Sequence, residues 1–275
     1  MLRRNLRSEF VAGAYVFPGG SVDPDDRSPA AAALCRGRTD AEASAMLGMD
    51  SGGLAFWVAA LRECFEEAGV MLARRGDPEH PDTGMPLDTS DPETSERFTH
   101  YRDALNQQRI GLLDICTEEQ LLLAADTMYY ISHWITPEVA PKRYDTRFFI
   151  TAAPPGQIAR HDDGETIATI WVRAEDALRR NLAGEIDLLP PTVTNLGAIS
   201  SFRSTAEVMA WAAQVTSVPT VLPIVVLVDG QLVVLRPGDA GYDEAFSDRL
   251  IAGSEMPSDL SAAALEAWGP KADTD

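Results

Sequence analysis

The chain has 275 residues, with 42 acidic and 23 basic side chains and a formal net charge of −19. Proteins that bind nucleic acids gather Lys and Arg against phosphate, so this charge balance argues against that class. The composition, 45% hydrophobic and 24% charged, is typical of a globular protein. No apolar run approaches the roughly 20 residues that a membrane helix needs. We therefore expect a soluble, cytoplasmic protein with neither nucleic acid nor membrane as a partner.

The three cysteines, Cys35, Cys64 and Cys116, are far apart in the sequence and form no C-x-x-C pair. We expect them to be reduced and buried. An acidic protein that acts on an anionic substrate would repel it, unless divalent metal ions reverse the local charge. Clusters of metal ligands are therefore the feature to look for.

The first predicted elements surround a glycine loop. Residues 10–17 mix β-branched, aromatic and glycine residues, which predicts a strand that ends at Pro18-Gly19-Gly20. Residues 28–53 have the composition of an insertion, with a helix predicted near residues 40–49. Residues 54–75 show the clearest helical period in the chain, and Arg74-Arg75-Gly76 predicts the end of that helix.

The later elements come in groups of helices and groups of strands. We expect helices at residues 93–110, 117–125, 174–182, 191–202 and 205–214. We expect strands at residues 127–135, 146–152 and 166–172. Residues 222–228 and 231–235 predict a hairpin, because two apolar runs flank an Asp-Gly turn.

The strongest helix carries a cluster of acidic residues. At about 100° per residue, Glu63, Glu66 and Glu67 share one face, since they are spaced i, i+3 and i+4. An apolar stripe occupies another arc of the helix: Trp57, Leu61, Cys64, Phe65, Ala68 and Leu72. Like charges at this spacing repel unless they are neutralised, and clustered carboxylates are ligands for Mg²⁺ or Mn²⁺. A solvated acidic helix face is the other interpretation of the same pattern.

The residues around this cluster resemble a known motif. Residues 62–70, with the sequence R-E-C-F-E-E-A-G-V, resemble the second half of the Nudix box, R-E-U-x-E-E-x-G-U with U apolar. Upstream, Phe17-Pro18-Gly19-Gly20 resembles the loop that opens the box, and Asp26 stands where the first Glu of the box is expected. About 28 additional residues separate these two parts. Whether Asp26 reaches the helix is left open by the sequence.

The split box resembles one branch of the family, which contains the mammalian peroxisomal coenzyme A diphosphatase. That resemblance implies a single Nudix domain over residues 1–275 with an α/β fold, an α/β/α sandwich around a mixed β-sheet. It also implies a helical insertion at about 27–55, a helical and hairpin extension at about 184–268, and a disordered tail at 269–275. In this family a strand normally ends where Leu2-Arg3-Arg4 stands, so we expect a shortened first strand, and a homodimer is one way to complete the sheet.

The resemblance also implies an activity, the hydrolysis of a pyrophosphate in a nucleoside diphosphate derivative by attack of water. It assigns Mg²⁺ or Mn²⁺ to Glu63, Glu66 and Glu67, and gives Glu63, Glu66 and Arg62 catalytic roles. Gly19 and Gly20 would lie beside the substrate, where a backbone without side chains can turn sharply. The general base in this family is a box Glu or an acid on a later loop. Glu165 is our candidate, although an exposed turn would also explain it.

The substrate is less well defined by the sequence. Arg143 and Arg147 could bind a substrate phosphate, such as the 3′-phosphate of coenzyme A, and a structural pair of Arg147 with Asp145 is an equal alternative. Our first hypothesis is cleavage of CoA or acyl-CoA to 3′,5′-ADP and (acyl)phosphopantetheine. The second is cleavage of ADP-ribose, NADH or another nucleoside diphosphate derivative. The third is a Nudix module that binds a nucleotide without cleaving it.

Overall fold

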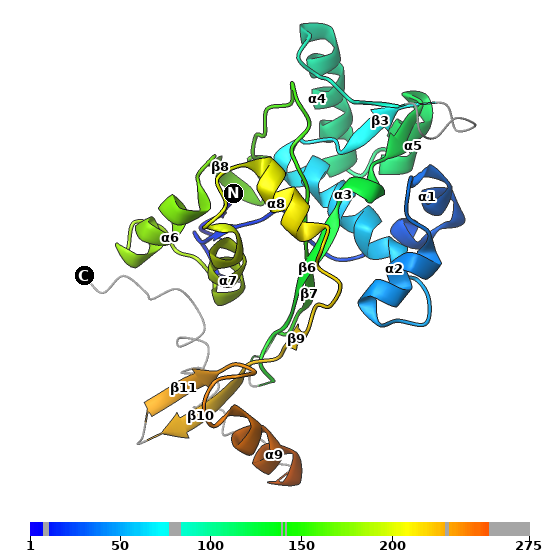
Figure 1. Cartoon of the computed structure of the whole chain (residues 1–275). Coiled ribbons are helices and arrows are strands. Elements are labelled where there is room, and N and C mark those ends of the chain that lie inside the picture. The colour runs from blue at the N-terminus through cyan, green and yellow to red at the C-terminus, as the bar shows by residue number, and fades with distance from the viewer. Residues whose placement is uncertain (8–10, 77–83, 139, 141, 229–230, 253–275) are drawn as a thin grey trace.

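The computed structural model of the chain describes residues 1–7, 11–76, 84–138, 140, 142–228 and 231–252. Short runs of helices and short runs of strands follow one another along it (Figure 1). The α-helices are α1 (Pro29–Leu34), α2 (Asp40–Leu47), α3 (Leu54–Ala68), α4 (Pro92–Asn106), α5 (Leu112–Glu118), α6 (Ala174–Leu182), α7 (Pro190–Ile199), α8 (Thr205–Ala212) and α9 (Tyr242–Ala252). The strands are β1 (Leu2–Arg4), β2 (Tyr15–Val16), β3 (Ala73–Arg75), β4 (Met85–Pro86), β5 (Leu121–Leu123), β6 (Tyr129–Ile135), β7 (Asp145–Ile150), β8 (Thr166–Thr169), β9 (Thr220–Val221), β10 (Ile224–Val228) and β11 (Gln231–Leu235). The short 3-10 helices η1 (Asp25–Arg27) and η3 (Ala125–Thr127) also lie in the described part of the chain.

Among the described residues, the strands pair in four small sheets. The short first strand β1 lies between β2 and β8 and is antiparallel to both, with Leu2 opposite Val16 and Thr169. Because both edges of β1 are paired, this short strand forms the centre of its sheet. The side chain of Leu2 is buried there. Strand β6 is antiparallel to β7 and parallel to β9, which gives the mixed pairing expected from the sequence. The other sheets are β4-β3-β5 and the β10-β11 hairpin.

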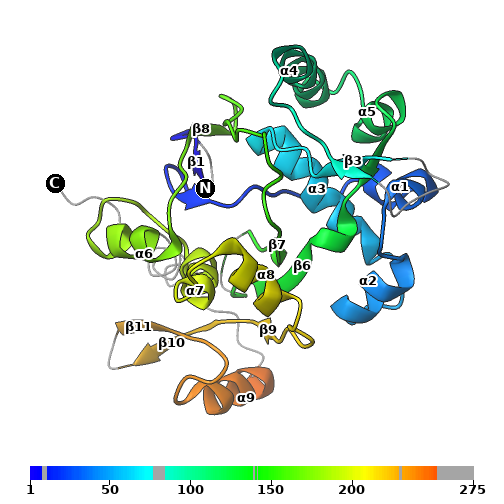
Figure 2. The ribbon, with the colours of Figure 1, turned by 45° about the horizontal axis from the view of Figure 1, so that its top comes forward.

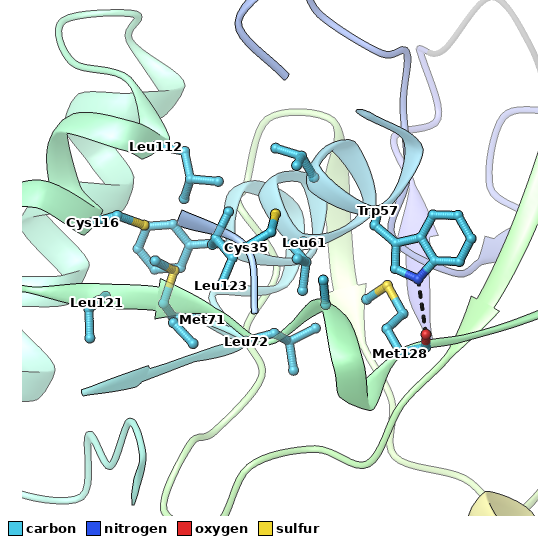
Figure 3. Packing of buried hydrophobic residues seen from close by; sticks show 14 of the residues in the cluster. Cys35, Trp57, Leu61, Met71, Leu72, Leu112, Cys116, Leu121, Leu123 and Met128 are labelled. Atoms are coloured by element: carbon cyan, nitrogen blue, oxygen red, sulfur yellow. Dashed lines mark hydrogen bonds between the residues drawn. The ribbon is translucent and has the colours of Figure 1, made fainter. Parts of the chain in front are cut away.

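Helix α3 is the centre of the main hydrophobic core. Figures 1 and 2 place it between α4 on one side and α1 and α2 on the other. Its predicted apolar stripe is buried except for Cys64, which is half-buried, and Trp57, Leu61 and Phe65 have no more than 2% of their surface exposed. The indole Nε1 of Trp57 donates a hydrogen bond of 3.0 Å to the carbonyl of Met128, beside strand β6 (Figure 3). Packing around α3 therefore fixes the orientation of its other, acidic face.

Both ends of α3 are defined by specific residues. At the start, the carboxylate of Asp40 accepts the N–H groups of Gly52 (2.9 Å) and Leu54 (3.0 Å), so the insertion caps the helix. At the end, Gly69 adopts the left-handed conformation with φ of +67° and closes the helix. The prediction that the helix continues to Arg75 was wrong, because residues 73–75 form β3 and pair with β5.

A second predicted helix was also placed incorrectly. The helix expected at 117–125 ends at Glu118 as part of α5, and residues 121–123 form the fully buried strand β5. A short apolar run without helical breakers fits either element, and pairing with β3 selects the strand.

The other predictions for the elements agree in position, with differences at their ends. Of the strand expected at 10–17, only residues 15–16 pair, and residue 10 lies outside the described part. The strand expected at 166–172 stops at Thr169 and leaves Trp171 exposed. Helices α1 and α9 were not predicted, and the turn at 229–230 and the tail at 269–275 lie outside the described residues. No helix in the described part is long and apolar enough to span a membrane.

Candidate active site

The two halves of the split box meet in space. The backbone N–H of Gly19 donates a hydrogen bond of 3.1 Å to Oε2 of Glu67 on α3. Gly20 approaches the helix so closely that a Cβ atom there would lie 2.3 Å from Oε1 of Glu63. The insertion is therefore looped out, and the glycine loop lies against the acidic face of α3.

Arg62 holds this acidic face together. Its Nη1 lies 2.9 Å from Oε1 of Glu63 and 2.7 Å from Oε2 of Glu66, while its Nε and Nη2 both lie 3.1 Å from Asp26 oxygens. Only 9% of the Arg62 side chain and 3% of the Asp26 side chain are exposed. Asp26 therefore does reach the helix, through Arg62. Burial alone would lower the pKa of the guanidinium, but its carboxylate partners, Asp26 first, raise it.

The carboxylates do not form a solvated helix face, so that interpretation was wrong. Glu67 is buried, and Glu63 and Glu66 are largely covered, with 12% and 21% of their side chains exposed. Burial raises the pKa of Glu63 to about 7 and that of Glu67 to about 8, with neighbouring negative charges adding to the effect. Burial also raises the pKa of Glu66, against the influence of Arg62. The negative charge of this site is therefore incompletely balanced by the protein.

The chemistry of the donors fits a hard divalent cation. Buried carboxylate oxygens are the ligands that Mg²⁺ and Mn²⁺ prefer, and a cation would remove the charge imbalance. Within the described residues, however, no group of three or more His, Cys, Asp or Glu side chains is arranged so that it could hold a metal ion as it stands. Glu63 and Glu66 instead point at Arg62. A cation that uses them must therefore compete with this guanidinium.

Glu165 lies close enough to the acidic face for its charge to act there, although it comes about 100 residues later in the chain. It directly precedes β8, is exposed, and accepts the N–H of Asn5 with its carbonyl at 2.9 Å. Its negative charge contributes to raising the pKa of both Glu63 and Glu67. The sheet β2-β1-β8 brings it there, because β1 pairs with both β2, which leads into the glycine loop, and β8.

The two candidate arginines have different surroundings. Arg143 donates from Nε to the carbonyl of Thr136 at 3.1 Å. Arg147 forms the expected pair with Asp145, at 3.0 Å, and its guanidinium lies 4.3 Å from the ring centre of Phe56 on α3. Its Nε is buried and has no hydrogen-bond partner among the described residues. Phe56 is two helical turns before Glu63, so Arg147 lies over the same face of α3 as the carboxylates.

Two residues that lie near the candidate site, His133 and Arg102, were not identified from the sequence. His133 on β6 lies opposite Arg147 on β7, with its Nε2 2.5 Å from the Asp145 carboxylate and its Nδ1 2.8 Å from Thr220 Oγ1. Strand pairing of β6 with β7 could have suggested His133. Arg102 on α4 donates to the backbone of α3, and no motif in the sequence indicates that contact.

Comparison with known proteins identifies the family. The sequence model of the family described as the NUDT19 Nudix domain matches residues 39–199, which is more than half of the chain. The chain is a Nudix hydrolase. This Nudix hydrolase is accordingly a pyrophosphohydrolase, which disfavours the non-catalytic module among our three hypotheses. The matched range begins inside the insertion, so the place of the glycine loop in the site rests on its contacts with Glu63 and Glu67.

Similar proteins support the same fold and enzyme class. The acyl-coenzyme A diphosphatase NUDT19 of Homo sapiens is 26% identical over 94% of this chain and 76% of its own length. The protein of that name from Gallus gallus is 27% identical over 88% of this chain and 72% of its own length. The crystal structure of a NUDIX hydrolase from Alicyclobacillus acidocaldarius matches with a TM-score of 0.55 and 27% identity, covering 76% of this chain and 86% of that one. The α/β Nudix fold expected from the sequence is thereby confirmed.

Proposed function

We propose that this Nudix hydrolase cleaves the pyrophosphate of CoA or acyl-CoA, with Mg²⁺ or Mn²⁺, and releases 3′,5′-ADP and (acyl)phosphopantetheine. The observation that carries the proposal is the contact of the Gly19-Gly20 loop with Glu63 and Glu67 on α3. It places a backbone without side chains directly against buried, incompletely balanced carboxylates. The substrate class is supported by similarity to proteins named acyl-coenzyme A diphosphatase.

The acidic face would hold the cation through Glu63, Glu66 and Glu67. A bound divalent cation would offset the negative charge of the pyrophosphate and lower the pKa of bound water. Arg62 holds Glu63 and Glu66 at fixed positions before the cation arrives, and Asp26 fixes Arg62. The guanidinium also limits repulsion between the carboxylates and the anionic substrate.

Hydrolysis needs a group that accepts a proton from water. The water oxygen forms a bond to one phosphorus, the bridging P–O bond breaks, and the second phosphate leaves with the bridging oxygen. In our proposal the carboxylate of Glu165 takes the proton that the attacking water loses. Its exposure and its electrostatic influence on Glu63 and Glu67 support this role, because a base must face both solvent and the reacting centre.

The 3′-phosphate of the substrate, which is separate from the pyrophosphate, would bind near Arg147. Both Arg143 and Arg147 were candidates, and the contacts favour Arg147, because its buried Nε retains an unused donor within the described part of the chain. Its position over the same face of α3 as Glu63 supports contact with the same substrate molecule.

Product analysis by mass spectrometry tests this function. Purified protein is incubated with CoA, acyl-CoA, ADP-ribose, NADH and nucleoside triphosphates, with Mg²⁺ or Mn²⁺. The exposed Glu175 on α6 provides the matched control: Glu67→Gln should abolish cleavage, whereas Glu175→Gln should preserve it. Release of 3′,5′-ADP from CoA in a metal-dependent reaction is the expected result. Preferred cleavage of ADP-ribose or NADH would overturn the substrate assignment, and cleavage by Glu67→Gln would overturn the assigned site.

A further inference from the structure

Helix α4 sends a basic side chain to the end of the acidic helix. Nε of Arg102 donates a hydrogen bond of 2.8 Å to the backbone carbonyl of Glu66, and Nδ2 of Asn106 donates to the same carbonyl at 3.2 Å. The last carbonyls of a helix have no partners within the helix, so these donors cap its C-terminal end. Arg102 thereby fixes the backbone of a residue that belongs to the acidic face.

The same guanidinium also contacts the loop that carries Glu165. Nη1 of Arg102 donates to the carbonyl of His161 at 3.4 Å. A neighbouring backbone contact reinforces this junction, because the N–H of Arg160 donates to the carbonyl of Ala68 at 2.8 Å. The guanidinium fits here because Gly69 has no side chain; a Cβ atom at that position would lie 3.2 Å from Nη1.

The loop between His161 and β8 is held rigidly by its own hydrogen bonds. The carboxylate of Asp162 accepts the backbone N–H groups of Glu165 and Thr166, both at 2.9 Å, and the hydroxyl of Thr166 at 2.7 Å. On the other side, Asn5 donates from its side chain to the carbonyl of Gly164 at 2.9 Å. These hydrogen bonds tie the backbone at Glu165 to Asp162, the residue next to His161.

Burying the charged guanidinium of Arg102 costs free energy, which the contacts that it makes must offset. Burial lowers the pKa of its guanidinium, and its Nη2 is buried without a hydrogen-bond partner among the described residues. Acidic groups around the junction, Asp162 first and Glu67 among them, oppose that lowering. A lysine could retain the charge, but its single ammonium lacks the planar fork that reaches two carbonyls at once.

We propose that Arg102 is a positioning residue, which joins the end of α3 to the 161–165 loop and so holds Glu165 at a fixed place relative to Glu63 and Glu67. This inference rests on the proposed function, because Glu165 is there the base that takes a proton from water. Displacing a reacting group by about 1 Å can lower a rate on the order of a hundredfold. Arg102 would therefore influence turnover without touching the substrate.

The test compares Arg102→Gln, Arg102→Lys, Glu165→Gln and the double variant Arg102→Gln/Glu165→Gln. Arg97→Gln is the matched control, since Arg97 lies on the same helix and pairs with Glu119 away from the site. We expect Arg102→Gln to lower kcat by on the order of ten- to a hundredfold with KM nearly unchanged. In the Glu165→Gln background the same change should lower kcat by less than about twofold, because both act on one step. Arg102→Lys should restore only part of the activity.

Hydrogen–deuterium exchange of the metal-free protein tests the positioning independently of activity. Exchange in residues 160–166 should become faster in Arg102→Gln and remain unchanged in Arg97→Gln. Unchanged exchange in Arg102→Gln would overturn the positioning role, even if the enzyme cleaves its substrate as proposed. Multiplicative losses of kcat in the double variant, or an equal loss in Arg97→Gln, would also overturn it. If Glu165→Gln retains full kcat, the proposed base is wrong, and the link from Arg102 to turnover fails with it. If Arg102→Gln does not fold, Arg102→Lys and the same exchange measurement decide.

Discussion

The buried pair of Asp26 and Arg62 should be the most sensitive electrostatic contact of this Nudix hydrolase. Removing one partner of a buried ion pair typically lowers the free energy of unfolding by about 3–5 kcal/mol. Arg62 would keep Glu63 and Glu66 as partners after Asp26→Ala, so we expect the lower end, about 3 kcal/mol. For a domain of this size that loss corresponds to a decrease of about 6–12 °C in Tm.

Asp23 provides an internal control for this measurement. Its carboxylate lies 3.7 Å from Nη2 of Arg62, the nitrogen that also contacts Asp26, but 53% of the Asp23 side chain is exposed. Asp23→Ala should therefore lower the free energy of unfolding by no more than about 1 kcal/mol. Urea unfolding of both variants, followed by circular dichroism, gives the two values. Equal losses in Asp26→Ala and Asp23→Ala would show that the buried geometry does not determine the strength of the contact.

Three other predictions concern the cation, the substrate and the core. Mn²⁺ at about 100 times its Kd should stabilise the wild type by about 2.7 kcal/mol, and Glu67→Gln should abolish the rise in Tm; an equal rise in that variant would place the cation elsewhere. Arg147→Gln should raise KM for CoA more than for dephospho-CoA, whereas Arg143→Gln should affect both equally, and steady-state kinetics would expose the opposite pattern. Trp57→Phe should lower the free energy of unfolding by about 0.5–1.5 kcal/mol, because the carbonyl of Met128 loses its 3.0 Å donor and keeps only the longer bond of 3.4 Å from Nη2 of Arg38; an unchanged urea midpoint would contradict this.

The acidic face could be predicted from the sequence because its information is local. The spacing of Glu63, Glu66 and Glu67 on one helix needs no knowledge of the rest of the chain. The buried stripe with Trp57 and Phe65 follows from the same helical period and was confirmed. The resemblance to the Nudix box then supplied the chemistry, which the helix pattern alone left open.

The remaining features depend on contacts between distant segments. Whether Asp26 reaches α3 is decided by how the insertion folds back, and no local pattern encodes that path. The end of α3 was misplaced because the apolar residues after Gly69 continue a helical period while they enter β3, whose partner β5 lies about 50 residues later. Arg102 was overlooked for the same reason, since its partners are backbone carbonyls, which carry no sequence signature.

The central claim is that the glycine loop and α3 form one catalytic site across the insertion, and a pair of neighbouring substitutions tests it directly. In Gly20→Ala the new Cβ would lie 2.3 Å from Oε1 of Glu63, whereas in Gly19→Ala it would meet nothing within 4 Å. The carboxylate of Glu63 can make room only by giving up part of its contact with Arg62, so Gly20→Ala should lower Tm while Gly19→Ala keeps the wild-type value. We predict that Gly20→Ala lowers kcat for CoA hydrolysis by on the order of a hundredfold and that Gly19→Ala does not. Equal activity of the two variants would contradict the account.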